Sequence, residues 1–193
     1  YSLEELEELS AVCRERDLKL FVDGARLAYA LASPANDVTL ADLARLTDVF
    51  YIGGTKCGSL FGEAVVIPER GSIRQFVTQM KQHGALLAKG RLLGVQFEAL
   101  FEDGLYSTIG QPGVESTRRI REALIRAGYV VTMDSPTNLT FVALDQAGHE
   151  RLSRKVRYGI WETLPDGRLL ARLGTSWATP DTDVSAFEEA LTR

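Results

Sequence analysis

Two segments decide the fold of this chain: LKLFVDGARLAYAL at residues 18–31 and DVFYIGGTKCGSLFGEAVVI at residues 48–67. Each contains a short apolar run of the kind that forms a buried strand. The first run ends at Asp23, and the second leads through two glycines to Lys56. A helical pattern separates the runs, and the order strand, helix, strand predicts a parallel α/β sheet.

The flanking sequence extends this pattern on both sides. Ser2 and Glu5 form a capping-box pattern at the start of a predicted helix, and a third strand is predicted at 64–67. Residues 69–102 are mostly helical in pattern, with a break near Gly84. The first part of the chain is therefore expected to be a sheet with helices around it.

The second half of the chain alternates helices with strands that tight turns join. The predicted strands are YVVTM (129–133), LTFVAL (139–144), IWETL (160–164) and LLARLG (169–174), and the predicted helices are 113–127, 148–158 and a last one that begins near 180. This order favours an antiparallel sheet with helices on one face. The fold class is therefore α/β, with a mostly parallel-sheet domain at 1–83 and a smaller α+β domain at 84–193.

Composition narrows the classes of function. The 193 residues are 45% hydrophobic and carry a net charge of −4, which does not suit electrostatic binding of nucleic acid. No run of 18 apolar residues is present, so no membrane partner is expected. The two cysteines, Cys13 and Cys57, have no metal-ligand spacing and fit a reduced, cytoplasmic setting.

Asp23 and Lys56 are the candidate reactive residues because ligands of open α/β sheets bind at the carboxyl ends of the strands. Taken singly, Asp23 could cap the turn that follows it, and Lys56 could be a solvated loop lysine. Few polar residues flank Lys56, so we expect it to be withdrawn from solvent. An amine that forms a Schiff base, paired with a carboxylate that keeps a pyridine nitrogen protonated, is what a pyridoxal phosphate (PLP) enzyme requires.

Four segments resemble the threonine aldolases and their relatives among the β-eliminating lyases, a group of fold type I PLP enzymes. FVDGARLAYAL is similar to their DGAR segment, and GGTKCGSLFGEAVVI is similar to the segment that carries their cofactor-binding lysine. QHGALLAKGRLLGVQFEALFEDGLY resembles the long helix that follows, and LLARLGTSWATPDTDVSAFEEAL resembles the carboxy-terminal strand and helix. The matches keep the same order and extend over nearly the whole chain.

The resemblance implies a role for each matching position. Lys56 would bind PLP covalently, and Asp23 would pair with its pyridine nitrogen. Arg26 would point toward the cofactor and the substrate carboxylate, and Arg172 would bind the α-carboxylate as a bidentate fork, a geometry that a planar guanidinium suits. For Arg172 a solvent-facing strand position is the alternative. For Thr55, a hydrogen bond to the cofactor phosphate and simple strand propensity remain equal alternatives.

The implied activity is cleavage of the Cα–Cβ bond of a β-hydroxy-α-amino acid to glycine and an aldehyde. Another fold type I reaction, β-elimination or transamination, is the first alternative, and a non-catalytic association domain is the second. The resemblance also implies a small amino-acid substrate and a homo-oligomer. The family carries a phosphate-binding turn and a ring-stacking residue before the DGAR segment, so we expect this chain to be the carboxy-terminal part of such an enzyme and to require that amino-terminal portion.

Overall fold

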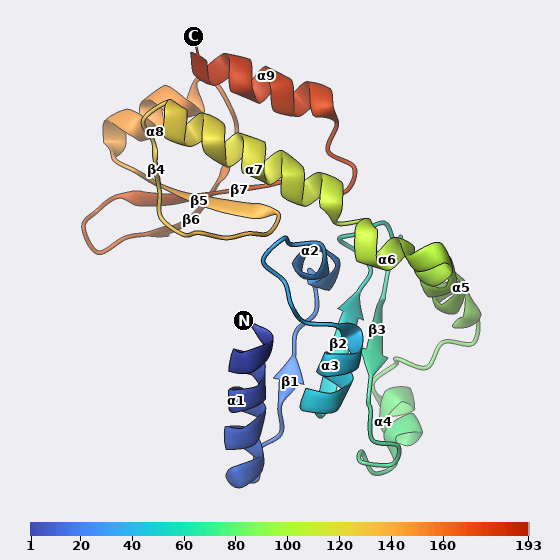
Figure 1. Cartoon of the computed structure of the whole chain (residues 1–193). Helices are drawn as coiled ribbons and strands as arrows, with labels where there is room; N and C mark the ends of the chain where they lie inside the picture. Colours follow the sequence, from blue (N-terminus) through green and yellow to red (C-terminus); the bar gives the residue numbers. More distant parts are fainter. Residues whose placement is uncertain (193) are drawn as a thin grey trace. The chain divides into compact units, whose positions relative to one another are not determined.

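The computed structural model describes residues 1–192 and divides into two compact units (Figure 1). The first unit comprises residues 1–31 and 36–108, and the second comprises residues 32–35 and 109–193. The elements of the first unit are α1 (Leu3–Glu15), β1 (Phe21–Val22), α2 (Leu27–Leu31), α3 (Leu40–Leu46), β2 (Val49–Gly53), β3 (Glu63–Val66), α4 (Phe76–Gln82), α5 (Arg91–Phe101), the 3-10 turn η1 (Glu102–Gly104) and α6 (Leu105–Thr108). Those of the second are α7 (Gln111–Arg126), β4 (Val130–Val131), β5 (Leu139–Leu144), α8 (Gln146–Ser153), β6 (Gly159–Thr163), β7 (Leu169–Gly174) and α9 (Asp181–Thr192).

The sheet of the first unit has the order β1-β2-β3. The strands β1 and β2 pair in parallel, with Phe21 opposite Val49, as the sequence predicts. The strand β3 is antiparallel to β2. The reason is the short connection at residues 54–62, since a parallel neighbour requires a crossover of about a dozen residues or more.

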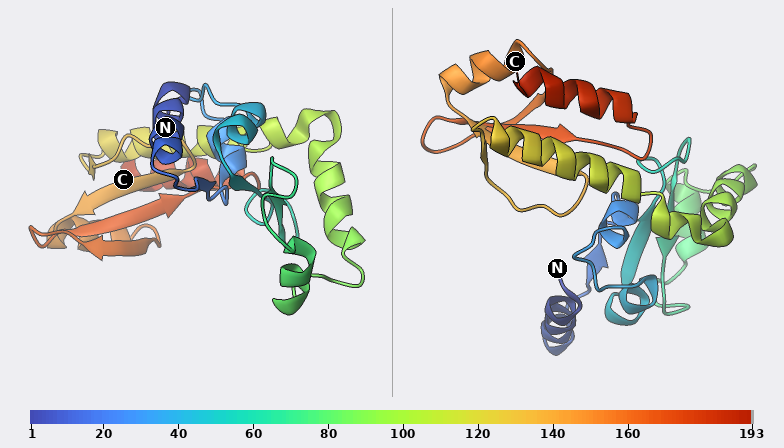
Figure 2. Two further views of the ribbon diagram at one scale, coloured as in Figure 1. Left: turned by 90° about the horizontal axis from the view of Figure 1, so that it is seen from below. Right: turned by 45° about the horizontal axis from the view of Figure 1, so that its top comes forward.

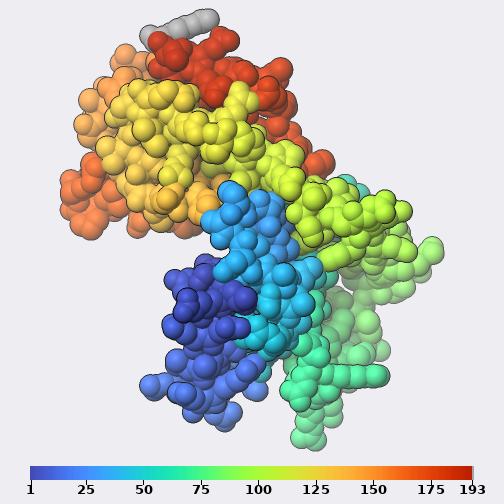
Figure 3. Space-filling view, in the orientation of Figure 1, coloured from blue at the N-terminus to red at the C-terminus, as the bar shows by residue number. Residues whose placement is uncertain are grey.

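Local capping explains where helix α1 begins. The Ser2 hydroxyl accepts a hydrogen bond from the Glu5 amide at 3.2 Å, and the Glu5 carboxylate accepts one from the Ser2 amide at 2.8 Å. This is the reciprocal capping box that the sequence predicts. Helices α1 and α3 pack against each other, and their atoms lie side by side in the space-filling view (Figure 3).

Residues 84–108 belong to the first unit, whereas the sequence analysis places its domain boundary between residues 83 and 84. Two side chains account for this grouping. The Gln96 carboxamide of α5 accepts a hydrogen bond from the Leu60 amide at 2.7 Å, and the Tyr106 phenol of α6 donates to the Gly53 carbonyl at 2.8 Å. When the boundary between the units lies after Thr108, both of these hydrogen bonds stay within the first unit.

The second unit contains an antiparallel sheet of order β4-β5-β7-β6. Helices α7, α8 and α9 lie on one face of this sheet, as predicted (Figure 2). The centre of the core is fully buried and joins Leu124 of α7, Val142 of β5, Leu152 of α8 and Ala171 of β7. Full burial of each large aliphatic side chain stabilises the fold by about 1.5–3 kcal/mol.

None of the helices within residues 1–192 has the length and the apolar character that crossing a bilayer would demand.

Candidate functional site

The carboxyl ends of β1 and β2 are in backbone contact because each carries a glycine. The Gly53 amide donates a hydrogen bond to the Gly24 carbonyl at 3.0 Å. A Cβ atom on Gly24 would lie 1.7 Å from the Tyr51 carbonyl oxygen, and one on Gly53 would lie 2.5 Å from the Gly24 carbonyl oxygen. No larger residue fits at either position without separating the strands, so the two glycines bring the Asp23 and Lys56 segments together.

Asp23 follows β1 directly, and its carboxylate is exposed. Its Oδ1 atom accepts hydrogen bonds from the Tyr51 phenol and, at 3.0 Å, from the Ala25 amide. These two bonds lower the pKa of Asp23, the phenol contributing most, and the positive charges of Lys56 and Arg26 lower it further. The carboxylate is therefore held in its ionised form. Within the described residues, Oδ2 accepts no hydrogen bond.

Lys56 lies in the connection between β2 and β3, residues 54–62, which we call the lysine loop. The expectation that Lys56 is withdrawn from solvent is wrong for this chain, because the residue is exposed. Its backbone is nevertheless held: the Tyr29 phenol, which is only 1% exposed, donates to the Lys56 carbonyl at 2.5 Å. A buried phenol thus fixes the backbone and leaves the amine accessible.

Thr55 precedes the lysine, and its hydroxyl donates to the Glu63 carboxylate at 2.8 Å. The same carboxylate accepts a hydrogen bond from the Gly54 amide. Glu63 thereby closes the lysine loop onto β3. A phosphate at Thr55 would have to replace the bond to Glu63, so the phosphate role of Thr55 stays a prediction.

Cys57, next to the lysine, is a packing residue. It is 2% exposed, and its thiol donates to the Gly53 carbonyl at 3.1 Å. Burial raises the pKa of Cys57 to about 11, so the thiol is protonated near neutral pH.

Arg172 belongs to the second unit, where it lies on β7. Val142 and Ala171 face the helices, so their neighbour Arg172 points to the opposite face of the sheet. Its guanidinium lies over the Trp161 ring at 4.7 Å from the centroid, and that ring makes an edge contact with Phe141. Stacking covers one plane of the guanidinium and leaves its edge, which carries the N–H donors, available.

The first unit thus brings Asp23, Arg26, Thr55 and Lys56 together at one end of its sheet, and Arg172 is part of the second unit. Sequence reasoning missed the residues that hold this site. They are three phenols and one carboxylate: Tyr29, Tyr51, Tyr106 and Glu63. One indication of these residues was present in the sequence, namely the alternation along β2, which places Tyr51 on one face of the strand.

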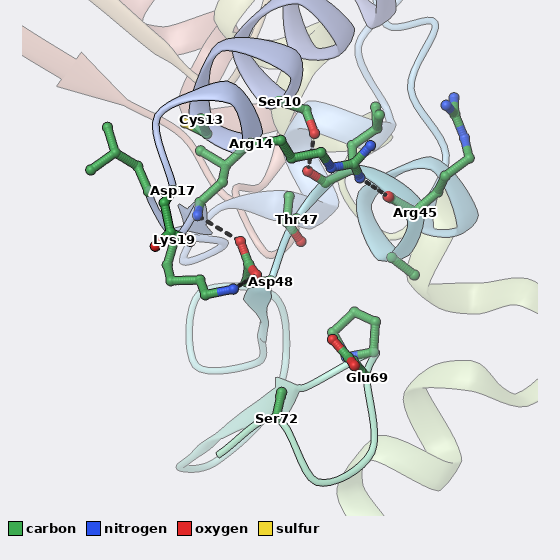
Figure 4. Close-up of a pocket in the computed structure, with 15 residues that line it drawn as sticks. Ser10, Cys13, Arg14, Asp17, Lys19, Arg45, Thr47, Asp48, Glu69 and Ser72 are labelled. Atoms are coloured by element: carbon green, nitrogen blue, oxygen red, sulfur yellow. Dashed lines mark hydrogen bonds and ion pairs between the residues drawn. The ribbon is translucent and has the colours of Figure 1, made fainter. Parts of the chain in front are cut away.

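A separate polar cavity of about 340 Å³ lies at the amino-terminal ends of β1 and β2, away from Asp23 and Lys56 (Figure 4). Two of its basic side chains are already engaged: Lys19 pairs with Asp48 at 3.1 Å, and Arg14 donates to the Arg45 backbone carbonyl at 2.8 Å. None of the predicted site residues lines it.

Comparison with known proteins places these features in context. The sequence profile described as "Beta-eliminating lyase" matches residues 1–157. A low specificity L-threonine aldolase from a Pseudomonas species is 37% identical over 110 residues, which cover 55% of this chain and 31% of that protein. The enzyme of the same name from Pseudomonas aeruginosa is 29% identical over 194 residues, covering 98% of this chain and 53% of that protein.

A solved structure of Leishmania major threonine aldolase is similar to the whole chain. It has a TM-score of 0.93 and 44% sequence identity, and the match covers 100% of this chain and 56% of that chain. The predicted fold class is therefore confirmed. The chain spans about half the length of the P. aeruginosa relative and of this solved chain.

Proposed function

The chain belongs to the beta-eliminating lyase family, and on this premise we propose that it serves a PLP-dependent lyase that cleaves the Cα–Cβ bond of a β-hydroxy-α-amino acid, releasing glycine and an aldehyde. The observation that carries the proposal is the contact between the ends of β1 and β2, which brings a carboxylate and an exposed amine to one end of the sheet. The threonine aldolase names of the relatives support the choice of bond and substrate class.

The residues present fit PLP. The ionised Asp23 carboxylate has an oxygen, Oδ2, that accepts no hydrogen bond within the described chain, and a protonated pyridine nitrogen is the kind of donor it would take. The Lys56 amine is exposed on a fixed backbone, as a covalent anchor must be. Arg26 adds positive charge near Asp23.

When bound, PLP supplies an electron sink for the pair of electrons that a broken bond at Cα leaves behind. Asp23 would keep a proton on the ring nitrogen, and this proton would sustain that sink. Arg172 would bind the substrate carboxylate through the N–H donors on the edge of its guanidinium. This contact would fix the orientation of the substrate and so select the bond that breaks. Lys56 would hold the cofactor covalently. Once the amino group of a substrate took its place, the free Lys56 amine could carry a proton.

We further propose that full activity requires sequence that the relatives carry outside the matched half, and that the active form is a homo-oligomer. The chain spans about half of the longer relatives, and this motivates the first proposal. A phosphate-binding turn in that other half would explain why Thr55 is engaged by Glu63 in this chain.

The test is a titration with PLP of the purified chain, expressed together with the amino-terminal half of the P. aeruginosa relative, followed by borohydride reduction and peptide mapping. We expect an absorbance band near the visible edge that borohydride removes, with the label on Lys56. Lys56→Ala should abolish both, whereas Lys89→Ala, a matched lysine variant outside the lysine loop, should keep them. Absence of labelling at Lys56, or equal labelling in the Lys56→Ala variant, would overturn the proposal.

The reaction itself is tested with the chain and the amino-terminal half of the P. aeruginosa relative, expressed together. Threonine should yield glycine and acetaldehyde, and serine should not yield pyruvate. Pyruvate and ammonia from serine would assign β-elimination instead, and hydroxypyruvate formed from serine in the presence of a keto-acid amino acceptor would assign transamination.

A further inference from the structure

Tyr51 makes a contact with Asp23 that none of the roles above explains. The residue lies in β2, half-buried, and its ring is 6.0 Å from the Phe21 ring on β1. Its phenol donates a hydrogen bond to Asp23 Oδ1. The Ala25 amide donates to the same oxygen at 3.0 Å.

Two donors on one oxygen restrict the carboxylate in a specific way. The Tyr51 phenol on β2 and the backbone amide of Ala25, two residues after Asp23, both donate to Oδ1. Rotation about the last side-chain torsion of Asp23 would therefore break both bonds. Oδ2 is then presented in a single direction. A hydrogen bond to a charged acceptor is stronger than one between neutral groups, so the phenol has a measurable effect on this orientation.

We propose that Tyr51 is a positioning residue that pins Asp23 Oδ1 so that Oδ2 is offered to a cationic N–H donor, which under the proposed function is the protonated pyridine nitrogen of PLP. The identity of the donor rests on the proposed function, whereas the pinning of Asp23 does not. Lys56 from the lysine loop and Arg26 before α2 are the charged groups whose fields act on Asp23, and Glu63 on β3 acts on Tyr51.

The contact also has an electrostatic consequence. The same hydrogen bond lowers the pKa of Asp23 and raises the pKa of Tyr51 to about 12. The phenol therefore keeps its proton, and the carboxylate keeps its charge, throughout the neutral range. A proton moving from Tyr51 to Asp23 would neutralise the carboxylate. The lowered pKa of Asp23 and the raised pKa of Tyr51 both oppose this transfer.

The test compares Tyr51→Phe with the wild type and with Tyr158→Phe. The first variant keeps the ring that contacts Phe21 and removes only the hydroxyl. The second removes the hydroxyl of a half-buried tyrosine that bonds to His149 at 2.8 Å in the second unit, and it controls for loss of a hydrogen-bonded tyrosine hydroxyl elsewhere in the chain. Far-UV circular dichroism establishes that all three chains are folded.

Two measurements decide the proposal. Carboxyl carbon NMR of the chain without PLP should show the pKa of Asp23 rising toward its usual range in Tyr51→Phe and staying low in Tyr158→Phe. Fluorescence titration with PLP should show affinity about tenfold weaker in Tyr51→Phe only, the equivalent of about 1.4 kcal/mol.

An unchanged Asp23 titration in Tyr51→Phe overturns the pinning. A raised pKa of Asp23 with unchanged PLP affinity overturns the presentation of Oδ2 to the cofactor. A wild-type chain that binds no PLP even when the amino-terminal half of the P. aeruginosa relative is supplied overturns the proposed function together with the identity of the donor. The NMR titration then still decides by itself whether Tyr51 pins Asp23.

Discussion

Replacing Gly24 by alanine should separate the two strand ends that carry the candidate site. The added Cβ would lie 1.7 Å from the Tyr51 carbonyl oxygen, whereas a carbon and an oxygen in weak contact are about 3.3 Å apart. The backbone must therefore move by about 1.6 Å, the difference between these distances. The obstructing atom belongs to the backbone of β2, so no side-chain rotation relieves the clash.

The cost of this movement can be worked from its parts. It breaks the 3.0 Å hydrogen bond from the Gly53 amide to the Gly24 carbonyl, and an unsatisfied buried group costs about 1–3 kcal/mol. Overpacking adds about 1–3 kcal/mol. The smaller conformational entropy of alanine in the unfolded chain returns about 0.4–1 kcal/mol. The free energy of unfolding of the first unit should fall by about 3 kcal/mol, the middle of the resulting range.

Gly94→Ala is the matched control, because it makes the same chemical change in the same unit. Gly94 lies inside α5, and a Cβ there would meet nothing within 4 Å. Alanine in a helix interior stabilises by about 0.5–1 kcal/mol relative to glycine. The two variants should therefore shift stability in opposite directions.

The assay is urea unfolding followed by circular dichroism, with hydrogen exchange of the Gly53 amide as a local probe of the strand contact. Gly24→Ala should lower the midpoint and the protection of that amide, and Gly94→Ala should lower neither. A Gly24→Ala chain with wild-type stability and a protected Gly53 amide would refute the backbone contact on which the site depends.

Three further predictions follow from single contacts. Tyr106→Phe removes the buried 2.8 Å hydrogen bond to the Gly53 carbonyl and should lower the stability of the first unit by about 1–2 kcal/mol in urea unfolding. Iodoacetamide at pH 8, followed by mass spectrometry, should label Cys13 before Cys57, because Cys57 is 2% exposed and its pKa is about 11; equal labelling rates would contradict its burial. The folded-state pKa of Asp23 is lowered, so the ionised carboxylate stabilises the fold at pH values above its unfolded pKa of about 3.9. This stabilisation is lost as the pH falls through the lower folded-state pKa. Asp23→Asn should remove this acid dependence in a pH series of thermal unfolding.

The elements that local patterns determine were predictable from the sequence. The capping box at Ser2 starts a helix, apolar runs form β2, β5 and β7, and left-handed Gly128 follows the end of α7. Each depends on residues within a few positions of one another. The direction of β3 depends instead on the length of its connection to β2, and the apolar pattern of the strand does not report it.

The charged residues of the candidate site were predictable from the sequence. The groups that hold those residues in place were not predictable. Gly24 follows Asp23 directly, and Gly53 and Gly54 precede Lys56 by two or three residues, so the place of both charged residues at the strand ends follows from the chain itself. The Tyr51 contact depends on the register between two strands, and the Tyr29 contact depends on how α2 packs. Exposure of Lys56 likewise depends on what surrounds the lysine loop, which the polarity of its neighbours does not determine.

The candidate residues fall in two different units, so their proposed roles can be tested separately. Asp23 and Lys56 belong to the first unit and are held there by the glycine contact and by phenols of the same unit. Arg172 belongs to the second, where its guanidinium lies over the Trp161 ring. Covalent labelling of Lys56 should therefore depend on the first unit and be indifferent to Trp161→Ala, whereas binding of an amino acid should depend on both.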